Sequence, residues 1–271
     1  MTVRIEKDGP VWTVIHDRPA ARNAMDPDSA KALYEAFLAF DADETASVAV
    51  FYGEGGAFCA GWDLKFVSTL DTKYPNKELD FSTADPRGNG GEIPRAPMGP
   101  SRLELDKPVI AAIEGPAVAG GMELALWCDF RVMADDAYMG VYCRRWGVPL
   151  IDGGTVRLPR IVGQGRALEI ILTGRKLPAE ECLSLGLAEY ITPSGGARAK
   201  AEALAREIAR FPQTCVRADR RSAIKSQGVS IRDGLVQEWY NGRLAVTEDG
   251  VAGATRFKDG LGRHGDFEKI R

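Results

Sequence analysis

Residues 107–135, KPVIAAIEGPAVAGGMELALWCDFRVMAD, contain an apolar run, a turn rich in glycine and alanine, and an apolar helix, in that order. The run of β-branched residues predicts a buried strand, and the apolar segment after the turn is long enough for a helix. The same order occurs at residues 47–64, SVAVFYGEGGAFCAGWDL, and a third round starts with AYMGVYCRRWG at residue 137. Repetition of a strand–turn–helix unit predicts a repeated α/β core.

The flanking segments extend this pattern toward both ends of the chain. A strand is predicted at residues 11–15, and a helix follows it, for which Asp26 is a suitable N-cap and Pro27 a suitable first residue. The last part of the chain is helical, and helices with apolar faces must pack against the core or against a neighbouring subunit. We therefore predict one continuous domain, with a core at residues 1–196 and a helical region at residues 197–271.

The composition is that of an ordinary globular protein and argues against several classes. Of the 271 residues 45% are hydrophobic, and the 35 lysines and arginines against 38 acids form no basic run interleaved with aromatics, so no nucleic-acid partner is expected. The five cysteines are odd in number and scattered, which favours reduced thiols over a disulfide framework. No apolar stretch reaches about 18 residues. The N-terminal residues also lack the apolar segment of a leader, so we expect a cytoplasmic protein without a membrane partner.

Proton transfer is expected to depend on carboxylates, because the other common catalytic groups are missing. The only histidines are His16 and His264, and His16 lies in an alternating strand pattern where a structural residue is expected. The sequence has no HExxH, no GxSxG and no cluster of cysteine and histidine. Zinc hydrolysis and a serine triad therefore both lack their residues, and no metal site is predicted.

The two glycine turns and Glu123 are the first candidates for chemistry. The stretch GEGGAFCAG lacks the spacing of a dinucleotide site and the ending of a phosphate-binding loop. Turns after neighbouring strands either direct backbone N–H groups to one point, as an oxyanion hole, or simply permit tight packing. Glu123 lies in the first turn of an apolar helix, where its carboxylate either interacts with the helix dipole or acts as a desolvated general acid or base.

Residues 68–101 interrupt the repeat with a segment rich in proline, glycine and charge. A long irregular loop inside a compact domain is usually either a surface excursion or functional. We expect either a surface loop or a wall of a substrate pocket.

Four segments together resemble the crotonase superfamily of enoyl-CoA hydratases and isomerases over about residues 3–260: RPAARNAMD, GGAFCAGWDL, IEGPAVAGGMELALWCDFRVMAD and GVPLIDGGTVRLPRIVGQGRALEIILTGRKLPAEECLSLGLAEYI. The resemblance implies an α/β crotonase-like spiral of repeated ββα units with a helical C-terminal region that packs across subunits. It also implies a homotrimer or a dimer of trimers, an acyl-CoA thioester substrate, and neither a metal nor a redox cofactor.

The resemblance also implies roles for individual residues. The backbone N–H groups of Ala60 and Gly120 would form the oxyanion hole, which stabilises the charge of an enolate more than the neutral ground state. The residues that would contact coenzyme A and line its thioester are Ala21, Arg22, Gly61, Trp62, Asp63 and Leu64. Two of these positions also have ordinary structural interpretations, since Arg22 could be a solvated arginine and Asp63 a helix N-cap.

The stretch YCRRWGVPLIDGG departs from the family pattern. Glu123 matches the first of two glutamates that a hydratase uses to position and split water, but the position of the second is occupied by Cys143, a neutral thiol that cannot replace a carboxylate. We interpret Cys143 as a small packing residue. Asp152 is either catalytic or a cap of the loop before two glycines, and Arg144 and Arg145 are either solvated or able to meet a carboxylate on the acyl group.

These observations predict an enoyl-CoA hydratase that acts on a 2-enoyl-CoA thioester through an atypical active site with Glu123 and Asp152. Enoyl-CoA isomerisation is the second hypothesis, because moving a proton between two carbons needs fewer groups than orienting water. The site could also belong to a different enolate-stabilising thioester enzyme, such as a hydrolase or decarboxylase, or to a catalytically silent acyl-CoA binder.

Overall fold

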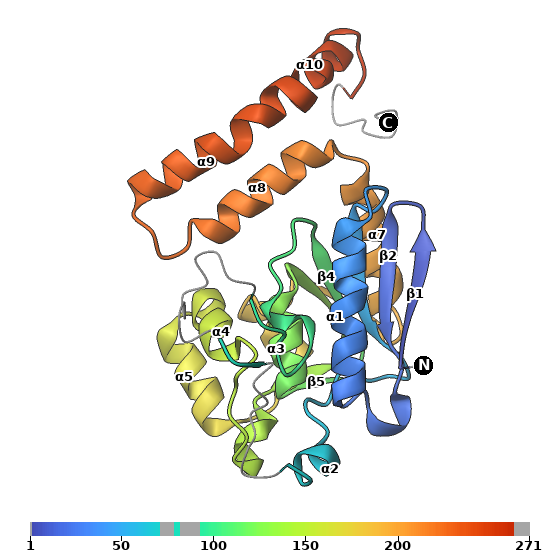
Figure 1. Ribbon diagram of the computed structural model, residues 1–271, viewed down its shortest axis with the longest axis vertical. Coiled ribbons are helices and arrows are strands. Elements are labelled where there is room, and N and C mark those ends of the chain that lie inside the picture. The colour runs from blue at the N-terminus through green and yellow to red at the C-terminus, as the bar shows by residue number, and fades with distance from the viewer. Residues whose placement is uncertain (1, 71–78, 82–92, 263–271) are drawn as a thin grey trace.

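A six-stranded sheet forms the centre of the molecule in the computed structural model, which describes residues 2–70, 79–81 and 93–262 (Figure 1). Its strand order is β1-β2-β3-β4-β6-β9. The first two strands form an antiparallel hairpin, and every later neighbour is parallel. The strands of this sheet are β1 (Val3–Asp8), β2 (Val11–His16), β3 (Val48–Gly53), β4 (Val109–Ile113), β6 (Phe130–Ala134) and β9 (Tyr190–Thr192).

Short strands form a second, smaller sheet. It contains β5 (Pro116–Val118), β7 (Tyr138–Gly140) and β8 (Leu177–Pro178), in the order β5-β7-β8. Single bridges extend it, since Met25 pairs with Trp62 and Cys59 pairs with Ala117. Each of the strands β2, β3 and β4 is thus followed by a short extended segment in the second layer and then by a helix. This is the repeated ββα unit that the family resemblance implied.

The helices begin close to the predicted positions. Helix α1 has Asp26 as its N-cap, whose carboxylate accepts from the N–H of Ser29 at 2.8 Å, and Pro27 as its first residue. Helix α2 is a single turn. The helices are α1 (Pro27–Ala42), α2 (Leu64–Val67), α3 (Gly120–Trp127), α4 (Gly154–Val162), α5 (Gln164–Thr173), α6 (Ala179–Ser184), α7 (Ala197–Ala209), α8 (Gln213–Lys225), α9 (Ile231–Ala245) and α10 (Val251–Lys258), with short 3-10 turns at Pro19–Ala21, Pro100–Arg102 and Tyr142–Trp146.

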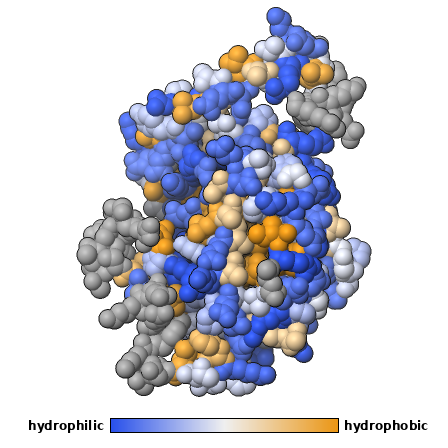
Figure 2. Space-filling view, turned by 45° about the vertical axis from the view of Figure 1, so that its right-hand side comes forward, coloured by the Kyte–Doolittle hydropathy of each residue, from blue (hydrophilic) through white to orange (hydrophobic). Residues whose placement is uncertain are grey.

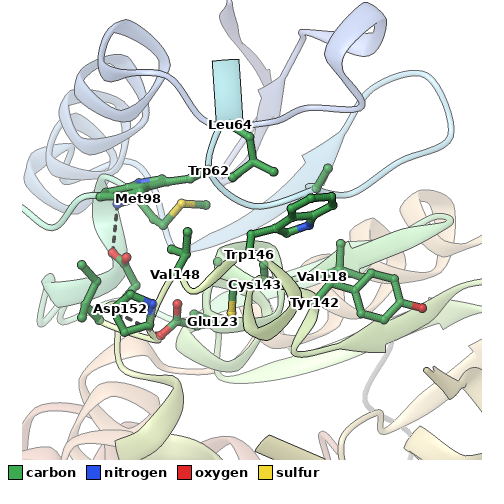
Figure 3. A pocket seen from close by; sticks show the side chains of 15 residues that line it. Trp62, Leu64, Met98, Val118, Glu123, Tyr142, Cys143, Trp146, Val148 and Asp152 are labelled. Atoms are coloured by element: carbon green, nitrogen blue, oxygen red, sulfur yellow. Dashed lines mark hydrogen bonds between the residues drawn. The ribbon is translucent and has the colours of Figure 1, made fainter. Parts of the chain in front are cut away.

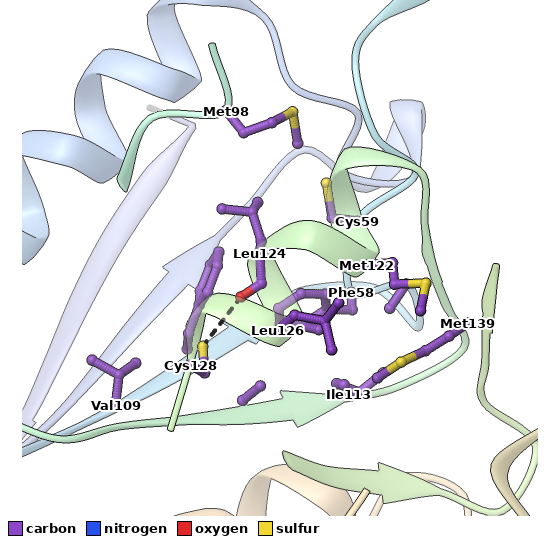
Figure 4. Packing of buried hydrophobic residues seen from close by; sticks show 14 of the residues in the cluster. Phe58, Cys59, Met98, Val109, Ile113, Met122, Leu124, Leu126, Cys128 and Met139 are labelled. Carbon is purple, nitrogen blue, oxygen red and sulfur yellow. Dashed lines mark hydrogen bonds between the residues drawn. The ribbon is translucent and has the colours of Figure 1, made fainter. Parts of the chain in front are cut away.

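Helix α3 lies inside the main hydrophobic core, and seven of its eight residues are buried (Figure 4). Aromatic rings fill the space between the large sheet and α1, where Phe51 meets Phe37 and Phe58 edge-on at centroid distances of 5.4 and 5.0 Å. The opposite face of the sheet is covered by α7, whose alanines and Leu204 pack against strand residues such as Ile110. The first helix of the predicted C-terminal region therefore belongs to the core.

Helices α8, α9 and α10 form an arm that extends beyond the sheet (Figure 1). Hydrophobic side chains are exposed along this arm at the top of the view in Figure 2. Ile231, Leu235 and Trp239 are 85%, 59% and 64% exposed, and their spacing of four residues puts them on one face of α9. Across the described part of the chain, no helix is both long and apolar enough to span a membrane.

Candidate active site

A cavity of about 150 Å³ lies where the glycine turns of the repeats meet (Figure 3). Its walls come from residues 60–64, 118–123 and 142–152 and from Met98. Most of the lining side chains are apolar or aromatic, and Trp62, Leu64 and Trp146 lie on the side opposite Glu123 (Figure 3). A mostly apolar cavity with a few convergent polar groups is the usual form of a small-molecule site.

Glu123 lies at the floor of this cavity, in the first turn of α3. Its side chain is held through one oxygen, since Oε1 accepts from the backbone N–H groups of Asp152 at 2.9 Å and Gly154 at 2.8 Å. The residue is only 2% exposed, and burial, followed by the negative charge of Asp152, raises the pKa of Glu123 to about 8. A buried carboxyl group with this pKa is suited to general acid or base chemistry near neutral pH.

Asp152 also lines the cavity, but its carboxylate points toward Met98 (Figure 3). Oδ1 accepts from the Met98 N–H at 2.9 Å and from the Ser101 hydroxyl at 2.6 Å. Burial is the main cause that raises the pKa of Asp152, and these two hydrogen bonds oppose the shift. The carboxylate does not cap its own loop, because its hydrogen-bond partners lie about fifty residues away in the chain. It joins the loop before α4 to the end of the irregular segment.

Cys143 lines the cavity in the 3-10 turn Tyr142–Trp146 and is buried. Burial and then the charge of Glu123 raise the pKa of its thiol. Arg144 lowers it by less, and its Nε donates to the Ile171 carbonyl instead of to a cavity group. Cys143 is thus a neutral thiol in the cavity wall. This agrees with its interpretation as a packing residue.

The glycine turns place backbone N–H groups at the cavity, although not quite as predicted. Gly120 is the first residue of α3, and its N–H is among those that have no partner within a helix. Gly61 lies against it, because a Cβ added to Gly61 would come 3.2 Å from the Gly120 nitrogen. The predicted donor Ala60, however, directs its N–H to the carbonyl of Arg22 at 3.1 Å and away from the thioester position.

The parallel bridge between Met25 and Trp62 explains this difference. The Met25 N–H donates to the Gly61 carbonyl at 2.7 Å, and the Asp63 N–H donates to the Met25 carbonyl at 2.8 Å. In a parallel pair, a residue flanked by two such bonds directs its own N–H to the opposite side. The N–H on the cavity side of this segment is therefore that of Trp62, two residues beyond the predicted donor.

The family described as enoyl-CoA hydratase/isomerase matches residues 6–85 and 100–228 of this chain. The chain belongs to this family. Enoyl-CoA hydratase EchA19 of Mycobacterium tuberculosis is 33% identical over 263 residues, covering 94% of this chain and 92% of that protein. A carnitinyl-CoA dehydratase of Salmonella arizonae is 33% identical over 247 residues, covering 88% of this chain and 84% of that protein.

Solved structures of the enoyl-CoA hydratase/isomerase family share the fold. An enoyl-CoA hydratase from Mycobacterium tuberculosis superimposes with a TM-score of 0.83 at 31% identity, over 95% of this chain and 96% of that one. One from Bacillus anthracis gives 0.84 at 28% identity, over 96% of both chains. The predicted crotonase fold and superfamily are confirmed. The protein is a member of a lyase-type enzyme family, and this membership implies an acyl-CoA substrate.

Only some of the residues predicted to contact coenzyme A line the cavity. Trp62 and Leu64 line the cavity. The other four, Ala21, Arg22, Gly61 and Asp63, do not. Arg22 is exposed, in a left-handed conformation just after the turn Pro19–Ala21. Asp63 caps α2 by accepting from the Lys65 N–H at 3.0 Å, so the N-cap interpretation describes it.

The partners of Asp152 were not identified from the sequence, and they are Met98, Ser101 and Arg157. Met98 and Ser101 lie in the irregular segment 68–101, whose parts 71–78 and 82–92 are outside the described residues. Met98 forms part of the cavity wall, so the end of this segment does shape the pocket. Within the described residues, no group of three or more His, Cys, Asp or Glu side chains is arranged to hold a metal ion.

Proposed function

We propose that the protein is an enoyl-CoA hydratase that adds water across the double bond of a 2-enoyl-CoA thioester, with Glu123 as the acid and base. The observation that carries this proposal is the Glu123 carboxyl group, fixed by two backbone N–H groups in an apolar cavity with its pKa raised to about 8. Hydration places OH on Cβ and H on Cα. The reaction therefore needs a group at this point that gives up and regains a proton at neutral pH.

The thioester carbonyl would lie between the N–H groups of Gly120 and Trp62. Both belong to the glycine turns that line the cavity, and they would stabilise the negative oxygen that forms when the double bond is attacked. This assignment keeps the predicted Gly120 donor and replaces Ala60. Removal of one such donor typically slows acyl chemistry by about 100-fold or more.

A second candidate is enoyl-CoA isomerisation, which Cys143 favours. This neutral thiol occupies the position where the resemblance predicts a second glutamate. Isomerisation moves a proton from one carbon of the acyl chain to another, which a single carboxyl group can do. Hydration ordinarily requires a second group to orient the water.

Both candidates can be tested with one set of variants. Purified protein is assayed with short 2-enoyl-CoA and 3-enoyl-CoA thioesters, and products are identified by mass spectrometry. Glu123→Gln is expected to lower turnover by about 100-fold to 10,000-fold while acyl-CoA binding persists in a thermal-shift assay. Glu114→Gln is a matched control, because Glu114 is also buried and also accepts from two backbone N–H groups, those of Gly195 and Ala197.

Each competing activity gives a distinct result in this assay. Free coenzyme A would indicate a hydrolase, and carbon dioxide from a carboxylated acyl-CoA would indicate a decarboxylase. Binding without turnover in the wild-type protein would indicate a silent binder. Full activity of Glu123→Gln would refute the role of this residue.

We also propose that the protein is a cytoplasmic homotrimer or dimer of trimers, with Ala21 and Arg22 next to the bound coenzyme A. The exposed apolar face of α9 supports self-association, since isolated surface helices rarely leave such a stripe uncovered. Sedimentation velocity tests this, and Leu235→Glu is expected to shift the protein toward a smaller species. A monomeric wild-type protein would refute the proposed assembly.

A further inference from the structure

Asp152 connects three separate parts of the active site. Its carboxylate Oδ1 binds the Met98 N–H and the Ser101 hydroxyl, and its own N–H donates to Oε1 of Glu123 at 2.9 Å. Met98, Ser101, Asp152 and Glu123 are exposed by 1%, 1%, 3% and 2%, so water does not compete for these bonds. One residue thus ties the end of the irregular segment, the loop before α4 and the first turn of α3 together.

Arg157 acts to lower the pKa of Asp152, but its hydrogen bonds within the described structure go to backbone oxygens and not to either carboxyl group. Arg157, in α4, donates from Nη1 to the Asp152 carbonyl at 3.1 Å and from Nη2 to the Ser101 carbonyl at 2.7 Å. Its guanidinium is therefore bonded to backbone oxygens. Two buried carboxylates beside each other cannot both ionise at low cost, because each charge disfavours the other and both lose hydration.

We propose that Asp152 is the positioning residue of this site, which fixes Glu123 and carries the negative charge that keeps a single proton on the Glu123 carboxyl group at neutral pH. This inference rests on the proposed function, in which Glu123 exchanges a proton with the acyl chain. The hydroxyl of Ser101 and the N–H of Met98 stabilise the charge on Asp152. The two N–H bonds to Oε1 of Glu123 fix the proton-carrying group.

The other charged and titratable groups that face the pair support this division of charge. Burial raises the pKa of Asp152, and Arg102 and Arg157 oppose this shift together with the two hydrogen bonds. The charge of Asp152 is in turn the second cause, after burial, that raises the pKa of Glu123. The thiols of Cys143 and Cys59 have raised pKa values, so both stay neutral.

Two substitutions are expected to affect this titration differently. Asp152→Asn removes the charge and keeps an oxygen that can accept from Met98 and Ser101, so the midpoint for Glu123 should fall by about one to two pH units. Ser101→Ala removes one donor to Asp152 but leaves its charge in place in both protonation states of Glu123, so the midpoint should not fall. The difference separates the effect of the Asp152 charge from a general disturbance of its hydrogen bonds.

The measurement is infrared difference spectroscopy of the protonated carboxyl band during a titration from about pH 5 to about pH 10, without substrate. Glu123→Gln assigns the band, and Glu114→Gln serves as the unshifted control. The midpoint of the pH dependence of kcat/KM is expected to shift in each variant by the same amount as the midpoint of the infrared band. If Asp152→Asn titrates like the wild type, if Ser101→Ala lowers the midpoint as much as Asp152→Asn does, or if Glu114→Gln shifts equally, the proposal is wrong.

The variant Glu123→Gln preserves the test if Asp152→Asn does not fold, because the proposal leaves Asp152 charged at neutral pH. A protonated carboxyl band that Asp152 retains at neutral pH in Glu123→Gln would contradict the proposal. The outcome is separate from that of the proposed function. Absence of enoyl-CoA turnover in the wild-type protein would refute the proposed function, whereas the infrared titration would still decide whether Asp152 and Glu123 hold one proton.

Discussion

The guanidinium of Arg18 lies 2.7 Å from Oδ2 of Asp63, and this ion pair joins the end of β2 to the first turn of α2. The same guanidinium pairs with Asp26 at 3.2 Å and donates to the Ala24 carbonyl at 2.6 Å. Arg18 thus fixes the N-caps of two helices. Because Trp62 and Leu64 flank Asp63 in the cavity wall, the ion pair also holds that wall in place.

Asp63→Asn and Asp63→Ala are expected to separate the ion pair from the helix cap. Asparagine can still cap α2 but cannot pair with Arg18, which should cost about 1–2 kcal/mol of unfolding free energy. Alanine loses the cap as well, for about 1 kcal/mol more. Urea unfolding measures both, and KM for acyl-CoA should rise in each. Equal stability of Asp63→Asn and the wild type would show that Arg18 does not hold this segment.

The pH dependence of the same pair has a definite sign. The guanidinium of Arg18 is the main cause that lowers the pKa of Asp63 in the folded protein. Its contribution is therefore fully present above the unfolded value of about 4 and is lost as the pH falls below that value. The unfolding free energy of Asp63→Asn should therefore fall less at acid pH than that of the wild type.

Ala119→Gly is expected to stabilise the protein. Ala119 precedes α3 with φ 55° and ψ −126°, a conformation that a residue with a Cβ rarely adopts. Relief of this strain should contribute about 1–3 kcal/mol, against about 0.4–1 kcal/mol for the greater freedom of glycine in the unfolded chain. Thermal unfolding should show a higher Tm. A lower Tm would mean that packing of the Ala119 methyl group outweighs the strain.

His16 is expected to make the protein sensitive to mild acid. Both ring nitrogens are buried without a hydrogen-bond partner in the described structure, and burial lowers the pKa of His16 to about 4. Since this value lies below that of the unfolded chain, protonation favours unfolding, and stability is lost as the pH falls from about 6.5 toward 4. Between neutral pH and about pH 5 the loss should be about 2 kcal/mol.

The variant His16→Leu should remove this pH dependence. Unfolding free energies of the variant and the wild type are compared at neutral pH and near pH 5. The variant need not match the wild type in absolute stability, but its slope against pH should be smaller. A slope equal to that of the wild type would contradict the assignment of this effect to His16.

Much of the fold was predictable because its signals are local. Apolar runs, the Asp26–Pro27 helix start and the glycine turns each lie within a few residues, so strand, cap and turn could be recognised directly. Glu123 could be identified for the same reason, since its position in the first turn of α3 follows from the glycines before it. The direction of an N–H in the second layer could not, because the Met25–Trp62 bridge joins segments far apart in the chain and determines which peptide faces the cavity.

The partners of Asp152 illustrate the same limit. Met98 and Ser101 lie about fifty residues away, in a segment without periodicity, and no local pattern connects them to Asp152. The sequence identified Asp152 as a candidate from its chemistry and its place before two glycines. Whether its carboxylate faced the substrate or the protein depended on long-range packing.

Cys143→Glu is the last prediction, and it tests whether the site has lost a carboxylate. If Cys143 replaces a group that orients water, Cys143→Glu should raise hydration relative to isomerisation, although a third carboxyl group near Glu123 and Asp152 will cost stability. Cys143→Ala should leave turnover within about threefold, because a neutral thiol contributes mainly packing. Because Cys143 is buried and its pKa is raised, it should react with iodoacetamide more slowly at neutral pH than Cys215, which is exposed. Loss of activity in the folded Cys143→Ala variant would instead identify the thiol as a participant in the reaction.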